Sequence, residues 1–261
     1  MVDRIINLLV VAGTALLGVR LYTSGLSQKY RAFFYYLIFS TLQTGVMMCL
    51  QNGPHDKSYT YAYIGTEPIG WIFYALVVLE LYSLVLADYQ GLYTVGRWAL
   101  IIAVTLALLA SALSLLVPSI GKQQTSLLGG FSVLRYYYVA ERAVYLSLIV
   151  FLLTILFVLL QYPITLKRNI VVHLVVFLVY FLGNTVAYLV VSMVGWGAVK
   201  AVQYPLWAVT LGSLAAWLAL LNPAGEMRKV RLRPAWMPGK EEQLVSQLNS
   251  LNAALLRATR K

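Results

Sequence analysis

The residues of this 261-residue chain that could do chemistry are few, and they stand inside long apolar runs. The run NIVVHLVVFLVYFLGNTVAY, residues 169–188, carries His173 and Asn184, and an earlier run carries Glu80. Because histidine changes charge near neutral pH, an acid paired with an imidazole could form a proton-sensitive switch. We group Glu80, His173, Asn184 and Arg20 as this hypothetical intramembrane switch, with His173 or Arg20 as the partner of Glu80. The alternative is a static hydrogen bond that holds two helices together.

A second group of polar and aromatic residues stands toward the opposite ends of these runs. Arginines and aromatic rings could together hold a small amphipathic acid in a pocket. Trp and Tyr also favour bilayer interfaces without any binding role, so an aromatic belt is the alternative. The residues of this candidate ligand site are Glu67, Trp71, Tyr74, Arg135, Tyr138, Glu141 and Arg142.

These side chains must be positioned by elements that suit a bilayer. The chain is 61% hydrophobic and 11% charged, whereas soluble domains carry about 25% charged residues. A spanning helix needs roughly 20 mainly apolar residues, and such windows occur at 5–24, 31–51, 66–87, 97–118, 138–161, 169–194 and 202–221. The windows are apolar on every face, unlike the alternating strands of a membrane β-barrel. We therefore predict an all-α fold with seven transmembrane helices.

Polar residues inside such helices usually face the bundle interior, because exposure to lipid is costly. Helical spacing places them on one stripe in each of two windows. In window 31–51 the stripe contains Tyr36, Ser40 and Gln43, and in window 169–194 it contains His173, Tyr180, Asn184 and Tyr188.

The distribution of basic residues predicts the orientation of the helices. If the windows alternate in direction, fourteen of the 20 Lys and Arg residues fall on one side. Short cytoplasmic loops are enriched in Lys and Arg, so we expect the N-terminus outside and the C-terminus in the cytoplasm. The predicted organisation is a transmembrane domain (1–222), a basic linker containing Pro and Gly (223–239) and a cytoplasmic amphipathic helix (240–261).

The C-terminal tail contains eight of the 20 Lys and Arg residues of a chain whose net charge is +11. Basic residues beside a membrane helix attract anionic lipid headgroups, so we expect lipid rather than nucleic acid to be bound by Arg228, Lys229, Arg231 and Arg233. Further on, the coiled-coil spacing of four and three residues is followed by Leu244, Leu248, Leu251 and Leu255. This helix could lie on the membrane, join copies of the chain, or bind a cytosolic partner.

No catalytic, metal-binding or cofactor-binding motif is found. The two histidines, of which His55 stands in a loop, provide neither a bis-histidine haem pair nor an HExxH zinc site. The single cysteine, Cys49, excludes an intramolecular disulfide and a multi-cysteine metal site. We predict no metal and no cofactor, and the sequence favours a protein that is not an enzyme.

The segments YPITLKRNIVVH (162–173) and EEQLVSQLNSLNAALLR (241–257), together with the seven-helix layout, resemble a group of uncharacterised bacterial seven-helix integral membrane proteins. The layout also looks like that of receptor-type seven-helix proteins, without the motif residues of eukaryotic G-protein-coupled receptors. The resemblance implies a bacterial cytoplasmic (inner) membrane, and no activity is attached to it.

Three functions are compatible with this sequence. We favour a receptor-like or sensory protein that binds a small ligand at its outer side and signals through a cytosolic or membrane partner. The first alternative is a small-solute transporter or channel, which needs a continuous polar path from Glu67 to Glu80; a hydrophobic plug between them would count against it. The second alternative is a structural or assembly subunit that works through residues 240–261.

Overall fold

The computed structural model describes residues 2–50, 57–86, 132–161, 165–194, 199–230 and 240–259, with Thr94, Arg97, Trp98, Ile101, Ile102 and Thr105 between them. The long helices are α1 (Val2–Thr23), α2 (Arg31–Leu50), α3 (Lys57–Val85), α5 (Ser132–Gln161), α6 (Arg168–Val194), α7 (Val199–Leu220) and α9 (Lys240–Thr259). Short elements connect them: η1 (Leu26–Gln28), β1 (Leu166–Lys167), α8 (Ala224–Met227) and β2 (Lys229–Val230). The described chain is therefore helical apart from one two-residue strand pair.

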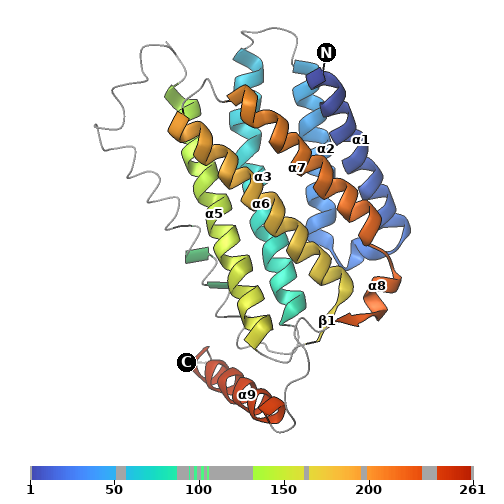
Figure 1. Cartoon of the computed structure of the whole chain (residues 1–261), viewed down its shortest axis with the longest axis vertical. Coiled ribbons are helices and arrows are strands. Elements are labelled where there is room, and N and C mark those ends of the chain that lie inside the picture. Colours follow the sequence, from blue (N-terminus) through green and yellow to red (C-terminus); the bar gives the residue numbers. More distant parts are fainter. Residues whose placement is uncertain are drawn as a thin grey trace.

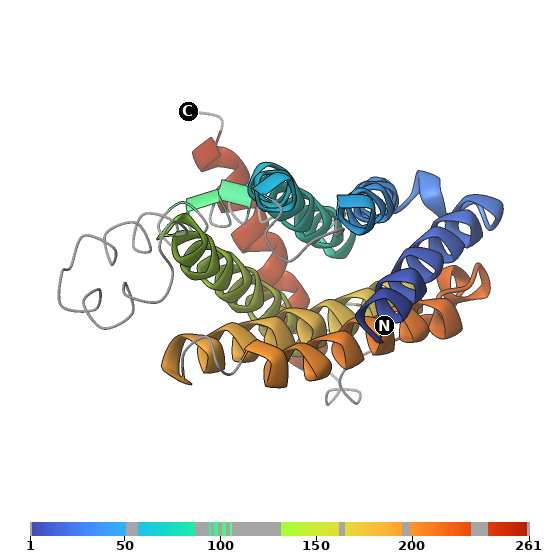
Figure 2. The same cartoon turned by 90° about the horizontal axis from the view of Figure 1, so that it is seen from above.

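The six long helices before α8 stand side by side in one bundle (Figure 1). Helix α1 packs on α2, α2 packs on α3, α5 packs on α6, and α6 packs on α7. Contacts of α1 with α7 and of α3 with α5 close the ring that is seen from above in Figure 2. The N-terminus lies at one end of the bundle, and β1, α8 and α9 lie at the opposite end (Figure 1).

Five helices in the described ranges are long and apolar enough to cross a membrane: Asp3–Thr23, Arg31–Leu50, Tyr61–Val85, Ala140–Phe157 and Arg168–Val191. The prediction of a helical membrane protein is therefore confirmed in this part of the chain. Helix α7 fills the predicted window 202–221 but is not among the five. Most of window 97–118 lies outside the described residues.

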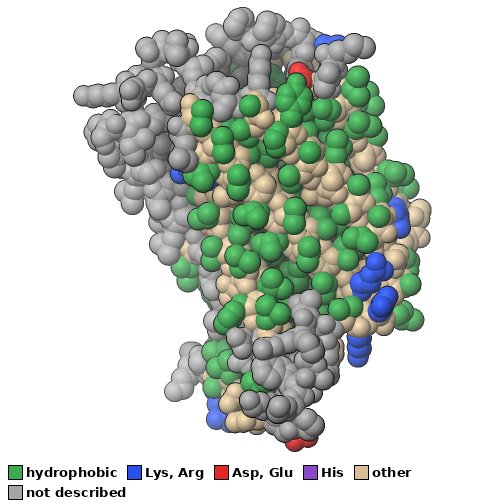
Figure 3. All heavy atoms as spheres, viewed as in Figure 1, with side chains coloured by type: hydrophobic (Ala, Val, Ile, Leu, Met, Phe, Trp, Pro, Cys, Tyr) green, Lys and Arg blue, Asp and Glu red, His purple; other side chains and the backbone are tan. Residues whose placement is uncertain are grey.

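The packing of α6 shows how one sequence serves both lipid and core. His173, Phe177, Phe181 and Asn184 are buried, whereas Val175, Val179, Leu182 and Val186 on the other side are about half exposed. Exposed apolar side chains of this kind cover the face of the bundle shown in Figure 3. His173 and Asn184 thus lie on one inward stripe, as helical spacing predicts.

The end of the bundle opposite the N-terminus is closed by segments that follow α7. Strand β2 pairs antiparallel with β1, with Lys229 opposite Lys167, and the Arg168 amide donates to the Arg228 carbonyl at 3.0 Å. Helix α8 packs against α6. The first part of the predicted linker, residues 223–230, contains α8 and β2, and residues 231–239 lie outside the described ranges.

Gly183 brings α6 and α7 close together. A Cβ at this position would lie 3.0 Å from both methyl carbons of Val209. Small residues at helix contacts allow such close approach in membranes. We expect Gly183→Leu to lower the free energy of unfolding by about 1–3 kcal/mol, the usual cost of overpacking, measured as a lower melting temperature in detergent. Gly45→Leu is the matched control, since no atom lies within 4 Å of a Cβ built there, and an equal loss in both variants would contradict the prediction.

Candidate functional site

A buried polar network lies in the half of the bundle nearer the N-terminus, and Glu141 of α5 is its centre. This side chain is 1% exposed. Its Oε1 accepts hydrogen bonds from the hydroxyl groups of Tyr188 at 2.7 Å and Tyr145 at 3.2 Å. Its Oε2 accepts one from Tyr63 at 3.4 Å. The three tyrosines come from α6, α5 and α3, so Glu141 connects three helices.

Glu67 of α3 lies close enough to Glu141 for the two carboxyl groups to interact electrostatically. A hydrogen bond between two carboxyl groups needs a proton on one of them, because an ionised carboxylate can only accept. Gln43 adds α2 to the network, because its Nε2 donates to Glu67 Oε2 and to Thr66 Oγ1, each at 3.1 Å. A protonatable acid pair therefore sits where four helices meet.

A chain of tyrosine hydroxyls continues the network toward the middle of the bundle. The hydroxyl groups of Tyr36 and Tyr74 are 3.3 Å apart, and those of Tyr74 and Tyr180 are 2.9 Å apart. Asn184 donates to the Tyr180 backbone carbonyl at 2.7 Å. Tyr36, Gln43, Tyr180 and Tyr188 were absent from the predicted ligand site, although their helical spacing had placed them on inward stripes.

The predicted ligand site is brought together only in part. Glu67, Tyr74 and Glu141 join the network, while Trp71 and Arg142 are half-buried. Arg135 and Tyr138 belong to α5, but their side chains lie outside the described residues. Glu141 and Glu67 accept hydrogen bonds from phenol and amide groups, and two neighbouring carboxyl groups suit a proton or a small cation better than the expected anion.

The predicted pair of Glu80 with His173 is wrong. The Glu80 carboxylate accepts hydrogen bonds from the backbone amides of Ala32 at 3.0 Å and Phe33 at 3.3 Å, in the first turn of α2. Unpaired amides and the helix dipole make this end of a helix a good partner for an anion. The alternative pair with Arg20 is also not formed, since Arg20 Nη2 donates to the Leu221 carbonyl at the end of α7, at 3.0 Å.

His173 lies at the expected depth but among aromatic rings. It is completely buried, with ring centroids 4.6 Å from Tyr30, 4.7 Å from Phe33 and 6.3 Å from Trp217. Neither ring nitrogen has a hydrogen-bond partner within the described part of the chain. The side chain therefore acts as one ring of an apolar aromatic cluster.

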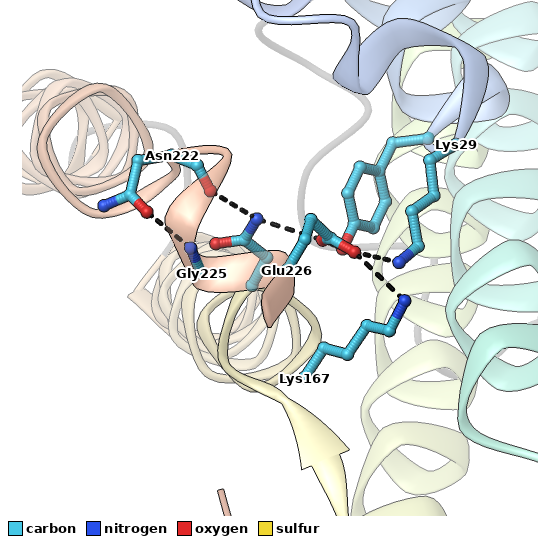
Figure 4. Close-up of polar contacts among 7 residues, drawn as sticks. Lys29, Lys167, Asn222, Gly225 and Glu226 are labelled. Carbon is cyan, nitrogen blue, oxygen red and sulfur yellow. Dashed lines mark hydrogen bonds and ion pairs between the residues drawn. The ribbon is translucent and has the colours of Figure 1, made fainter. Parts of the chain in front are cut away.

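A second polar cluster, which sequence reasoning missed, surrounds Glu226 of α8 at the end of the bundle opposite the N-terminus (Figure 4). This carboxylate is paired with Lys29 and lies 3.6 Å from Lys167 Nζ. It accepts hydrogen bonds from the Tyr30 hydroxyl at 2.6 Å and from Asn169 Nδ2 at 3.0 Å. Burial and the neighbouring Lys167 lower the pKa of Lys29 to about 8. We call these five side chains the Glu226 cluster.

Gly225 allows α8 to dock into the Glu226 cluster. A Cβ at this buried position would collide with the Asn169 side chain, which is itself fully buried and donates to the Asn222 carbonyl at 2.9 Å. The cluster thereby joins the α1–α2 connection, the start of α6 and the segment after α7. Sequence reasoning had no signal for it beyond one acid in a basic tail.

The predicted lipid and partner residues of the tail are only partly described. Arg228 and Lys229 are exposed beside the Glu226 cluster, and Arg231 and Arg233 lie outside the described residues. On α9, Leu248 is buried, Leu244 and Leu255 are half-buried and Leu251 is 43% exposed. Their roles in binding lipids or partners stay predictions.

Comparison with known proteins returns no match: no family model, no curated protein and no solved structure is similar to this chain. Within the described ranges, no group of three or more His, Cys, Asp or Glu side chains could hold a metal ion. The interpretation of the site therefore rests on its geometry.

His173→Phe tests the aromatic cluster. An unpaired polar group buried in an apolar site costs about 1–3 kcal/mol, so an apolar ring of similar shape should leave the melting temperature in detergent unchanged or raise it. His173→Asp should lower it strongly, because a buried carboxylate would lack a partner. A clear loss of stability in His173→Phe would show that the imidazole has a polar role.

Gly225→Ala tests the docking of α8. The added methyl group has to displace Asn169, so we expect a loss of at least about 1–3 kcal/mol and faster proteolysis after α7. Gly212→Ala is the control, since nothing lies within 4 Å of its Cβ. Equal melting temperatures and equal proteolysis for the two variants would contradict the close contact.

Proposed function

We propose that this chain is a receptor-like, sensory protein with seven spanning helices in a bacterial cytoplasmic membrane. It takes up a small ligand in its outer half and signals through a cytosolic or membrane partner. The observation that carries the proposal is the pair of acids, buried Glu141 and half-buried Glu67, where α2, α3, α5 and α6 meet.

The path of the chain supports seven spans. Helix α3 ends at the end of the bundle where α8 lies, and α5 begins at the opposite end (Figure 1). The chain between α3 and α5 has to return from one end of the bundle to the other, and the predicted window 97–118 would supply that span. Helix α7 has 22 residues, as many as α1, and would be the seventh.

The distribution of charge supports the orientation. The end with α8 contains Lys29, Lys167, Arg168, Arg228 and Lys229, and cytoplasmic ends of membrane helices are rich in such residues. The N-terminus and the Glu67–Glu141 pair then belong to the outer half. Arg228 and Lys229, with Arg231 and Arg233 further on, would hold anionic headgroups.

Helix α6 is the element that would carry a signal between the two polar clusters. Its outer half contributes Tyr188 to Glu141, and its first turn contributes Asn169 to Glu226. A ligand or proton that changes the charge at Glu141 would favour one arrangement of α6 over another, which is how binding shifts a two-state protein. Helix α9 follows the Glu226 cluster and would present Leu251 to the partner.

Packing below the tyrosine chain favours a receptor over a transporter. Val77 and Val78 of α3, between Tyr74 and Glu80, are at most 1% exposed, as is Leu81 beside Glu80. Phe177 of α6 is completely buried. Within the described ranges this apolar layer separates the outer network from the inner end. A transported solute would need a polar path through it.

The proton is the probe for a first test, in nanodiscs, with Cys49→Ser and a dye that reports on its environment attached through Ser246→Cys on the exposed side of α9. Lowering the pH from about 8 to about 5 should change the dye signal, because protonation changes the charge of the Glu67–Glu141 pair and favours one arrangement of the helices. Glu141→Gln removes one titrating carboxyl and should abolish the change. Glu242→Gln, exposed on α9, should retain it.

Transport is tested separately with proteoliposomes that contain a pH-sensitive dye. The receptor proposal expects a proton flux equal to that of protein-free liposomes. A flux that disappears in Glu141→Gln would establish the transporter instead. Absence of both the flux and the α9 signal would overturn both functions and leave the structural subunit.

A further inference from the structure

A groove runs along the outer surface of the bundle between α1 and α2. It encloses about 360 Å³ and is lined by Thr14, Gly18 and Tyr22 of α1 and by Phe34, Ile38 and Leu42 of α2, among others. Tyr22 is 71% exposed and Leu42 63%, so the groove opens outward. Both helices are candidate membrane spans, and the groove therefore faces lipid.

The walls of the groove are almost entirely hydrocarbon, although two threonines lie in them. Thr14 Oγ1 donates to the Val10 carbonyl at 2.9 Å, and Thr41 Oγ1 lies 2.7 Å from the Leu37 carbonyl and 2.9 Å from Thr14 Oγ1. These contacts use the hydroxyl hydrogens inside the protein. An occupant therefore meets an apolar surface, which an alkyl chain matches.

The cationic side chain of Arg31 lies beyond the end of the groove that is nearer the Glu226 cluster. Phe34, Ile38 and Leu42 form one stripe of α2, and Arg31 continues that stripe one turn closer to the end with the Glu226 cluster. The guanidinium is exposed and donates through Nε to the Gln28 carbonyl at 3.0 Å. Glu80 is the acid near Arg31, and its oxygens already accept the α2 amides.

We propose that this groove binds one anionic phospholipid, with an acyl chain between α1 and α2 and its phosphate at Arg31. The geometry matches the two halves of such a molecule: an apolar groove within the span, and a guanidinium at headgroup depth that can bind phosphate through two nitrogens. A zwitterionic lipid fits the groove equally well but leaves the charge of Arg31 less well matched. The inference is independent of the proposed sensory function.

The test measures lipids on the purified full chain in neutral detergent. Native mass spectrometry counts bound dioleoylphosphatidylglycerol or dioleoylphosphatidylcholine, and thermal unfolding measures the shift caused by each. Gly18→Leu fills the groove without a clash, because no atom lies within 4 Å of a Cβ there. Gly45→Leu on α2 is the matched control, also without a neighbour within 4 Å, and Ile38→Trp fills the groove from the other wall.

We expect phosphatidylglycerol to raise the melting temperature by several degrees and to persist as one bound lipid. Gly18→Leu and Ile38→Trp should lose both effects, Gly45→Leu should keep them, and Arg31→Gln should reduce the phosphatidylglycerol effect to that of phosphatidylcholine. Glycerol 3-phosphate, the headgroup without chains, should have no effect. The proposal is overturned if both groove variants keep the phosphatidylglycerol shift, or if the two lipids act equally on the unmodified chain. The tail arginines are unchanged in all of these variants, so binding at the tail alone gives the overturning result.

Discussion

The lack of water in a bilayer is the constraint on which the rest of this structure depends. A polar group within a span is stabilised by a partner in the protein itself, and the unpartnered ring nitrogens of His173 are an exception among the described residues. Thr14, Ser147 and Thr154 gain such a partner by donating to carbonyls of their own helices, one turn back. The acids cannot, because a carboxylate needs donors from outside its own helix backbone. They therefore lie where neighbouring helices supply such donors, and those places are the two clusters and the start of α2.

The same constraint separates the molecule into layers. Polar side chains gather around Glu141 in one half of the bundle and around Glu226 at the opposite end. The aromatic rings of Phe33, His173 and Trp217 lie between these two polar regions along the bundle. Packed rings have few alternative arrangements, because interiors are as dense as organic crystals. We therefore expect a displacement of α6 at Tyr188 to be transmitted along the helix more readily than it is absorbed, as the proposed sensory function requires.

Sequence reasoning located the long helices because hydropathy and length alone determine a span. It also identified the inward stripes of α2 and α6, since helical spacing states which residues share a face. The partner of Glu80 was not predictable in this way. The rise per residue gives depth but not the direction around the helix, and the partners are backbone amides of Ala32 and Phe33, which no residue type reveals. Glu226 was missed because a single acid among arginines suggests a solvated tail, and because strands of two residues have no pattern.

The Glu226 cluster also bears on how the chain is made. Lys29 and Tyr30 emerge early in synthesis, but their carboxylate partner lies 197 and 196 residues further on. Asn169, which is buried in the finished protein, also donates a hydrogen bond to Glu226 and lacks this partner until Glu226 has been synthesised. The end of the bundle that contains the Glu226 cluster therefore closes only when α7 and α8 have been synthesised. Until then, the side chains of Lys29, Tyr30 and Asn169 lack their shared partner, which distinguishes an incomplete chain from a finished one.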